Sequence, residues 1–191
     1  RVEQNPDEKV SLLKTRQRTL TGALTKIRKP TIASLPGPAA GAGLAIALAC
    51  DIRIASESSF VSTGYARVGL SGDYGIAWLL TRLVGTAKAR ELMFTARRVT
   101  AEECSRIGLV NSVTKDPELR TKSFDLAKSL ANGPGIALAY MKDNLEDALT
   151  EPFLAALDNE AERLIITAQT ADHREAVQAF IQKKQPRFKG E

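Results

Sequence analysis

Apolar and polar residues alternate along this chain in short, well-separated segments. Residues 31–35 form a β-branched and apolar run, which predicts a short buried strand. Pro36, Gly37 and Pro38 end that strand, because proline lacks the backbone donor that a sheet requires. Residues 44–50 carry no polar side chain, so they predict a helix that is buried on all sides.

The segments on either side continue the alternation of strands and helices. A first helix is predicted to begin at Asn5, with one apolar stripe along it: Val10, Leu13, Leu20, Leu24 and Ile27. Strands are predicted at 51–55, from Phe60 onward and at 109–113. Helices are predicted at 76–84 and 86–95, separated by Gly85, and again from the capping box of Thr100 and Glu103.

From residue 116 onward the pattern is helical throughout. The predicted helices are 117–131, 136–149, 152–169 and 173–184. Strands that alternate with helices, followed by a helical tail, favour an α/β core over residues 1–113 and an α-helical C-terminal region over residues 114–191.

Composition narrows the class of protein. With 43% hydrophobic residues, the chain can bury a core, and no apolar run is long enough to span a membrane. The net charge of +5 would help hold a polyphosphate, but the few aromatic residues do not interleave with basic patches, so nucleic acid is not expected as a partner. The single histidine, His173, argues against a histidine metal cluster, and Cys50 and Cys104 favour reduced thiols in a cytoplasmic protein.

The turn before the buried helix is the first candidate for chemistry. Gly41, Ala42 and Gly43 would leave backbone N–H groups at the start of that helix open to a ligand oxygen. The following residues do not fit a phosphate-binding P-loop, and Ile46 stands where a dinucleotide fingerprint needs a small residue. Two interpretations remain, namely tight packing between strand and helix or an oxyanion site.

The same run carries a resemblance to a known family. KPTIASLPGPAAGAGLAIALACDIRIAS resembles the signature segment of the crotonase (enoyl-CoA hydratase/isomerase) superfamily, and the likeness continues through FVSTGYARVGLSGDYG to the tail EAVQAFIQKKQPRFKGE. The resemblance implies a spiral ββα core and C-terminal helices that pack trimers. Members of that family begin with several strands before a segment like residues 1–29, so those strands are expected to be missing here, and one of two oxyanion amides with them.

The resemblance also implies roles for individual residues. The backbone amide of Ala42, between Gly41 and Gly43, matches the oxyanion donor of the family. Hydratases of the family carry one glutamate where this chain has Ala45 and a second where it has Gly64 or Tyr65, so their two-glutamate mechanism is in doubt. Asp73 is the remaining carboxylate of the glycine-rich loop 69–75 and matches the proton-transferring aspartate of isomerases in the superfamily.

Some of these positions have structural alternatives. An aspartate in a glycine-rich loop commonly bonds its own backbone, and Tyr65 is either a hydrogen-bond donor in place of a carboxylate or a half-buried core residue. Phe180 and Lys183 match the place where family members reach coenzyme A on a neighbouring subunit, although they would also suit an ordinary amphipathic helix end.

Three functions follow from the resemblance. The chain is expected to be an enoyl-CoA hydratase/isomerase-family enzyme that forms an acyl-CoA enolate. One alternative is a double-bond isomerase that uses Asp73 alone, and the other is a non-catalytic family member that binds coenzyme A. A homotrimer or a dimer of trimers is expected, with no metal and no cofactor apart from the coenzyme A of the substrate.

Overall fold

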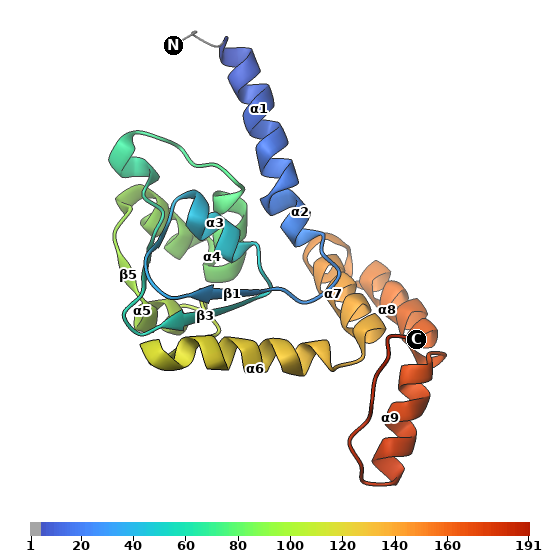
Figure 1. Ribbon diagram of the computed structural model, residues 1–191. Helices are drawn as coiled ribbons and strands as arrows, with labels where there is room; N and C mark the ends of the chain where they lie inside the picture. The colour runs from blue at the N-terminus through green and yellow to red at the C-terminus, as the bar shows by residue number, and fades with distance from the viewer. Residues whose placement is uncertain (1–4) are drawn as a thin grey trace. The chain divides into compact units, whose positions relative to one another are not determined.

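The computed structural model describes residues 5–191 and divides them into two compact units. The first unit runs to Ile27 and continues over Thr31–Ser123, and the second comprises Arg28–Pro30 and Phe124–Glu191. All the strands described lie in the first unit, and the second unit is helical (Figure 1). The mixed α/β class predicted from the sequence is confirmed. The sequence placed the division after Val113, whereas the compact units separate within a helix, after Ser123.

Two small sheets organise the first unit. One is wholly parallel, in the order β1 (Ile32–Leu35), β3 (Ile52–Ser56), β6 (Ser112–Thr114). The other joins β2 (Ala39–Ala40) to β4 (Phe60–Ser62) in parallel, and β4 to β5 (Val99–Thr100) in antiparallel fashion. Strands of two to five residues are too short to be stable alone, so these sheets depend on the helices packed against them.

The helix predicted to be buried is α3 (Ala42–Leu48), and it packs at the centre of the first unit. It contacts β1 and β2, which belong to different sheets, as well as α2 (Thr21–Thr25) and α4 (Ile76–Thr95). Four of its seven residues are buried: Leu44, Ala45, Ala47 and Leu48. These neighbours explain the apolar sequence of the helix, although Gly43 is exposed and Ile46 only partly buried.

The other helices of this unit follow the predicted pattern closely. In α4 the backbone leaves helical geometry at Gly85 (φ 75°, ψ 166°), so the two predicted helices are present with a break between them. Thr100 caps α5 (Ala101–Arg106), because its hydroxyl accepts a hydrogen bond from the N–H of Glu103 at 3.2 Å. A short 3-10 helix, η1 (Tyr65–Val68), follows β4.

Two predictions in this unit need correction. The single N-terminal helix is two, α1 (Pro6–Thr19) and α2, because the backbone turns at Leu20 (φ −110°, ψ −89°), and α1 buries none of its residues. The predicted strand at 109–113 is reduced to β6, since Leu109 and Val110 both direct their N–H groups to the Cys104 carbonyl and form a turn instead.

The second unit is built from helices. After η2 (Asp116–Glu118), α6 (Leu119–Ala131) passes from the first unit into the second, followed by α7 (Gly135–Thr150), α8 (Phe153–Ala168) and α9 (Ala171–Ile181). The C-terminal tail turns back along α9 (Figure 1), where the carboxylate of Asp172, only 3% exposed, accepts hydrogen bonds from the N–H groups of Lys189 and Gly190. None of the helices described has the length and apolarity needed to cross a membrane.

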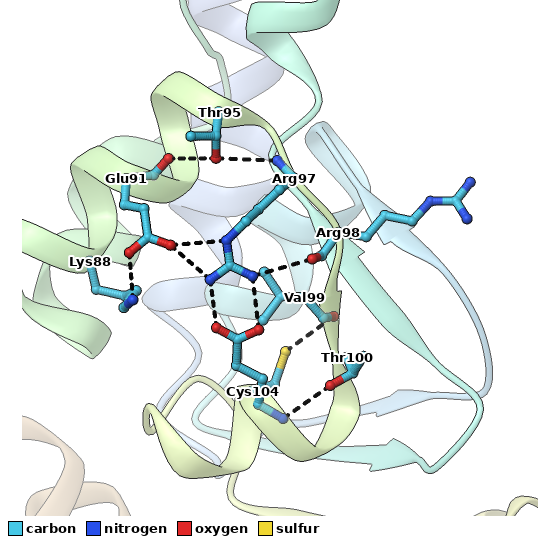
Figure 2. Close-up of polar contacts among 9 residues, drawn as sticks. Lys88, Glu91, Thr95, Arg97, Arg98, Val99, Thr100 and Cys104 are labelled. Atoms are coloured by element: carbon cyan, nitrogen blue, oxygen red, sulfur yellow. Dashed lines mark hydrogen bonds and ion pairs between the residues drawn. The ribbon is translucent and has the colours of Figure 1, made fainter.

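An arginine network joins the end of α4 to α5. The guanidinium of Arg97 makes two parallel hydrogen bonds to the carboxylate of Glu103 and also contacts Glu91, which in turn pairs with Lys88 (Figure 2). Lys88 and then Arg97 lower the pKa of Glu91, and Arg97 lowers the pKa of Glu103. The side chain of Glu103 is thus held by Arg97, while its backbone N–H is held by Thr100.

Arg97→Met should lower the melting temperature by roughly 2–4 °C at pH 7, the scale expected for a partly exposed network in a chain of this size. A carboxyl group whose pKa is lowered on folding stabilises the folded state above its unfolded pKa and loses that effect as pH falls through the folded value. The difference between wild type and Arg97→Met should therefore shrink as pH falls below the ordinary carboxyl pKa of 4.5. Calorimetry at pH 7 and pH 3 measures both effects, with the exposed Arg18→Met as control. An equal difference at the two pH values would contradict this account.

Candidate active site

The candidate site begins at the turn between β2 and α3. Gly41 has a left-handed backbone (φ 53°, ψ −126°), which an L side chain rarely adopts, and its N–H donates to the Ser62 carbonyl at 3.2 Å. The first backbone bond into α3 runs from Ala45 N–H to the Gly41 carbonyl at 3.0 Å. The N–H of Ala42, the first residue of α3, therefore has no partner within the helix.

Tyr65 lies beside this turn. It follows Gly64, which has a left-handed conformation (φ 75°) and immediately precedes η1. A Cβ atom placed on Gly41 would lie 3.8 Å from both the ring carbon Cζ and the hydroxyl of Tyr65. The side chain is 7% exposed, so the ring packs in the core with its hydroxyl next to the turn.

The hydroxyl of Tyr65 reaches the carboxylate of Asp73. It donates a hydrogen bond of 2.5 Å to Asp73 Oδ1. Burial, and next the hydrogen bond to Asp73, raise the pKa of Tyr65 well above its ordinary value of 10.0. The phenol thus stays protonated at neutral pH and acts as a donor to the carboxylate.

The loop that carries Asp73 has an unusual backbone. Gly72, Tyr74 and Gly75 all have positive φ angles (120°, 51° and 77°), and the Asp73 carbonyl accepts from Ile76 N–H at 3.1 Å as α4 begins. A Cβ on Gly72 would lie 3.3 Å from Ile76 Cγ2, so the loop fits tightly against that helix. Of these three residues, Tyr74 has the energetically least favourable backbone conformation, because a left-handed backbone is rare for a bulky residue.

Gln17 is a site residue that the sequence did not reveal. Its side-chain oxygen, from α1, accepts a hydrogen bond of 2.6 Å from the N–H of Tyr74. The contact links residues 57 positions apart, and a polar residue on an otherwise exposed helix has no local pattern that marks it out. Through this hydrogen bond, Gln17 holds the strained turn next to Asp73.

The positions of the missing hydratase glutamates hold no acid. Ala45 is 0% exposed within the hydrophobic core, and Gly64 has nothing within 4 Å of the place a Cβ would occupy. Of the predicted residues, the structure thus brings Gly41, Tyr65 and Asp73 into contact, with Ala42 and Gly43 following in the chain. The predicted catalytic roles themselves stay predictions.

Phe180 and Lys183 belong to the second unit. Phe180 lies near the end of α9 and is 84% exposed, and Lys183 follows the helix in a left-handed conformation (φ 53°). His173 is exposed on the same helix. Over residues 5–191, no group of three or more His, Cys, Asp or Glu side chains is arranged to hold a metal ion.

Comparison with known proteins identifies the family. The model of the enoyl-CoA hydratase/isomerase family matches residues 2–191, essentially the whole chain. The chain belongs to this family, within the crotonase superfamily. It is similar to a Rhodobacter capsulatus protein named "Probable enoyl-CoA hydratase", with 36% identity over 94% of this chain and 70% of the relative.

Two further relatives show the range of the family. The 1,2-epoxyphenylacetyl-CoA isomerase of Escherichia coli K12 is 35% identical over 90% of this chain and 65% of its own length. The crystal structure of an enoyl-CoA hydratase from Bacillus anthracis superposes with a TM-score of 0.93 at 30% identity, and covers 100% of this chain and 74% of the other. The chain therefore spans roughly two thirds to three quarters of these relatives.

Ala42→Pro tests the amide at the turn. Proline is tolerated at the first position of a helix, so this change removes one N–H group and leaves α3 in place. If that N–H stabilises an oxyanion, turnover of enoyl-CoA by the full-length protein should fall about 10²–10³-fold.

Ala171→Pro is the matched control, because Ala171 is the first residue of α9. It should keep wild-type turnover, with circular dichroism confirming that both variants fold. A folded Ala42→Pro variant with wild-type turnover would remove this amide from the mechanism.

Proposed function

We propose that this chain acts on an acyl-CoA thioester by forming an enolate, and that its reaction is double-bond isomerisation with Asp73 as the proton carrier. Membership of the enoyl-CoA hydratase/isomerase family supports the substrate class. The observation that supports this reaction is one carboxylate, Asp73, hydrogen-bonded to the tyrosine next to the Gly41 turn, with no acid at Ala45 or Gly64.

One carboxylate suffices for isomerisation. In a 3-enoyl thioester, Asp73 would take a proton from C2, and the electron pair of that C–H bond would spread over the double bond to the thioester oxygen. The Ala42 amide would donate a hydrogen bond to that oxygen. Return of the same proton to C4 gives the 2-enoyl thioester. No electrons are gained or lost overall, so the steps need no redox cofactor.

Hydration requires more catalytic groups than isomerisation. Adding water across a double bond normally uses one group to activate the water and another to supply the proton. With Ala45 fully buried and glycine at position 64, Asp73 has no second carboxylate at these positions. A relative named as a 1,2-epoxyphenylacetyl-CoA isomerase is in keeping with isomerase chemistry, although other relatives are named hydratases.

Asp73→Asn tests the assignment with little change in shape. The amide oxygen can still accept from Tyr65, but the base is lost, so conversion of 3-hexenoyl-CoA to 2-hexenoyl-CoA should fall about 10²–10⁴-fold. Products are separated by chromatography and identified by mass, with the exposed Asp125→Asn on α6 as control.

The same assay separates the alternatives. A gain of one water by wild type, without isomerisation, would show a hydratase and contradict the proposal. Binding of acyl-CoA without any product would favour the non-catalytic alternative. Wild-type rates in Asp73→Asn would exclude this residue as the proton carrier.

We further propose that the chain assembles as a trimer or a dimer of trimers. Two helices of sixteen residues each, α7 and α8, bury none of their residues within this chain. Their exposed apolar side chains form a large set: Met141, Leu145, Leu149, Phe153, Leu154, Leu157, Leu164, Ile165 and Ile166. Such helices normally gain their stability by burying an apolar face, and closed cyclic symmetry is the common way to do so between copies.

A neighbouring subunit would also explain the end of α9. Phe180 is almost fully exposed and could cover an adenine ring, and the ammonium of Lys183 could pair with a phosphate of coenzyme A. The resemblance to the family supports a contact across subunits, since its members use this position to reach coenzyme A bound to a neighbouring subunit.

Leu164→Asp tests the assembly. This side chain on α8 is 67% exposed in the single chain, so an aspartate there costs little unless another copy covers it. Light scattering at micromolar concentration should show wild type and the control Glu160→Gln at three or six times the monomer mass, and Leu164→Asp shifted towards monomer. A wild type that stays monomeric would contradict the proposal.

A further inference from the structure

Tyr65 lies between two parts of the candidate site. Its hydroxyl donates to Asp73 Oδ1 at 2.5 Å, and a Cβ added at Gly41 would lie 3.8 Å from both Cζ and the hydroxyl, so this end of the side chain is next to the turn before α3. We propose that Tyr65 is a positioning residue, which sets the carboxylate of Asp73 relative to the turn. This inference rests on the proposed function and assigns Tyr65 a role different from that of a substitute acid.

The attachment of Tyr65 makes it a rigid spacer. The ring is buried within the hydrophobic core, and η1 is bounded on both sides by left-handed glycines, Gly64 (φ 75°) and Gly69 (φ 69°). The Tyr65 carbonyl also accepts a hydrogen bond from Leu70 N–H at 3.0 Å. A buried aromatic side chain with a fixed backbone has few alternative rotamers, so it transmits the position of the turn to its hydroxyl.

The loop of Asp73 needs such a contact. Its backbone departs from ordinary geometry at Gly72, Tyr74 and Gly75, and Gln17 holds only the N–H of Tyr74. The carboxylate itself could still rotate about its side-chain bonds. The hydrogen bond from Tyr65 fixes one oxygen, Oδ1, and leaves Oδ2 available to exchange a proton with substrate.

Donation to a carboxylate also determines which group carries the proton. Burial and Asp73 both raise the pKa of Tyr65, so the phenol keeps its proton while Asp73 acts as base. Among the residues described, Asp73 and Tyr74 are the titratable groups that influence the pKa of Tyr65, and both belong to this loop.

Tyr65→Phe isolates the hydroxyl, because phenylalanine keeps the ring against Gly41. With 3-hexenoyl-CoA and the full-length protein, kcat should fall about 10–100-fold through loss of orientation, with KM little changed. Tyr140→Phe, on α7 in the second unit, removes a hydroxyl elsewhere and should change neither quantity.

A double variant shows whether Tyr65 acts through Asp73. If it does, adding Tyr65→Phe to Asp73→Asn should cause little further loss, whereas an independent acid would multiply the two losses. Unchanged kcat in a folded Tyr65→Phe variant would overturn the inference, as would multiplied losses in the double variant. Either result leaves the proposed function intact if Asp73→Asn is still impaired. A wild type without turnover overturns both.

Discussion

The burial of α3 is the constraint on which the first unit depends. This seven-residue helix contacts one strand from each of the two sheets and the helices α2 and α4. The strands are too short to persist without it, and a helix with neighbours on every side must be free of charge. Because α3 is fixed by these contacts, the turn that starts it is fixed too, and the N–H of Ala42 is held at the edge of the core. A carboxylate at Ala45 would have to lie within that core, where an unpaired charge is very costly.

The candidate site lies where the backbone of the first unit departs from regular geometry. Positive φ angles occur at Gly41, at Gly64 and on either side of Asp73, and these three places lie around one tyrosine, Tyr65. Strained backbone persists only where surrounding contacts hold it. Here those contacts are the Tyr65 hydroxyl on Asp73 and the Gln17 side chain on the N–H of Tyr74. The regular elements position the loop, Tyr65 holds the carboxylate of Asp73, and Gln17 holds the backbone beside it.

The sequence predicted local features better than contacts. The buried run around Leu44, the break at Gly85 and the cap at Thr100 each depend on residues close in the chain, and all three are present. No proline or run of glycines marks the position where the N-terminal helix divides at Leu20, so the division could not be predicted from the local sequence. Tyr65 and Asp73 were both candidates, but their bond could not be predicted because the geometry of η1 decides it. Gln17 was missed for the same reason, since its contact lies 57 residues away.

The second unit leaves much apolar surface of its long helices exposed. Ordering the sixteen residues of α7 and the sixteen of α8 costs conformational entropy of about 1–2 kcal/mol for each backbone residue. Ion pairs such as Arg163 with Asp147 offset little of this, because partly exposed pairs contribute about 0–1 kcal/mol. Burial of apolar surface is the term large enough to balance the entropy, and neither helix buries a residue inside the chain. If copies of the chain supply that burial, the contact that stabilises α7 and α8 is also the one that brings Phe180 and Lys183 towards a neighbouring site, so loss of assembly and loss of coenzyme A binding should occur together.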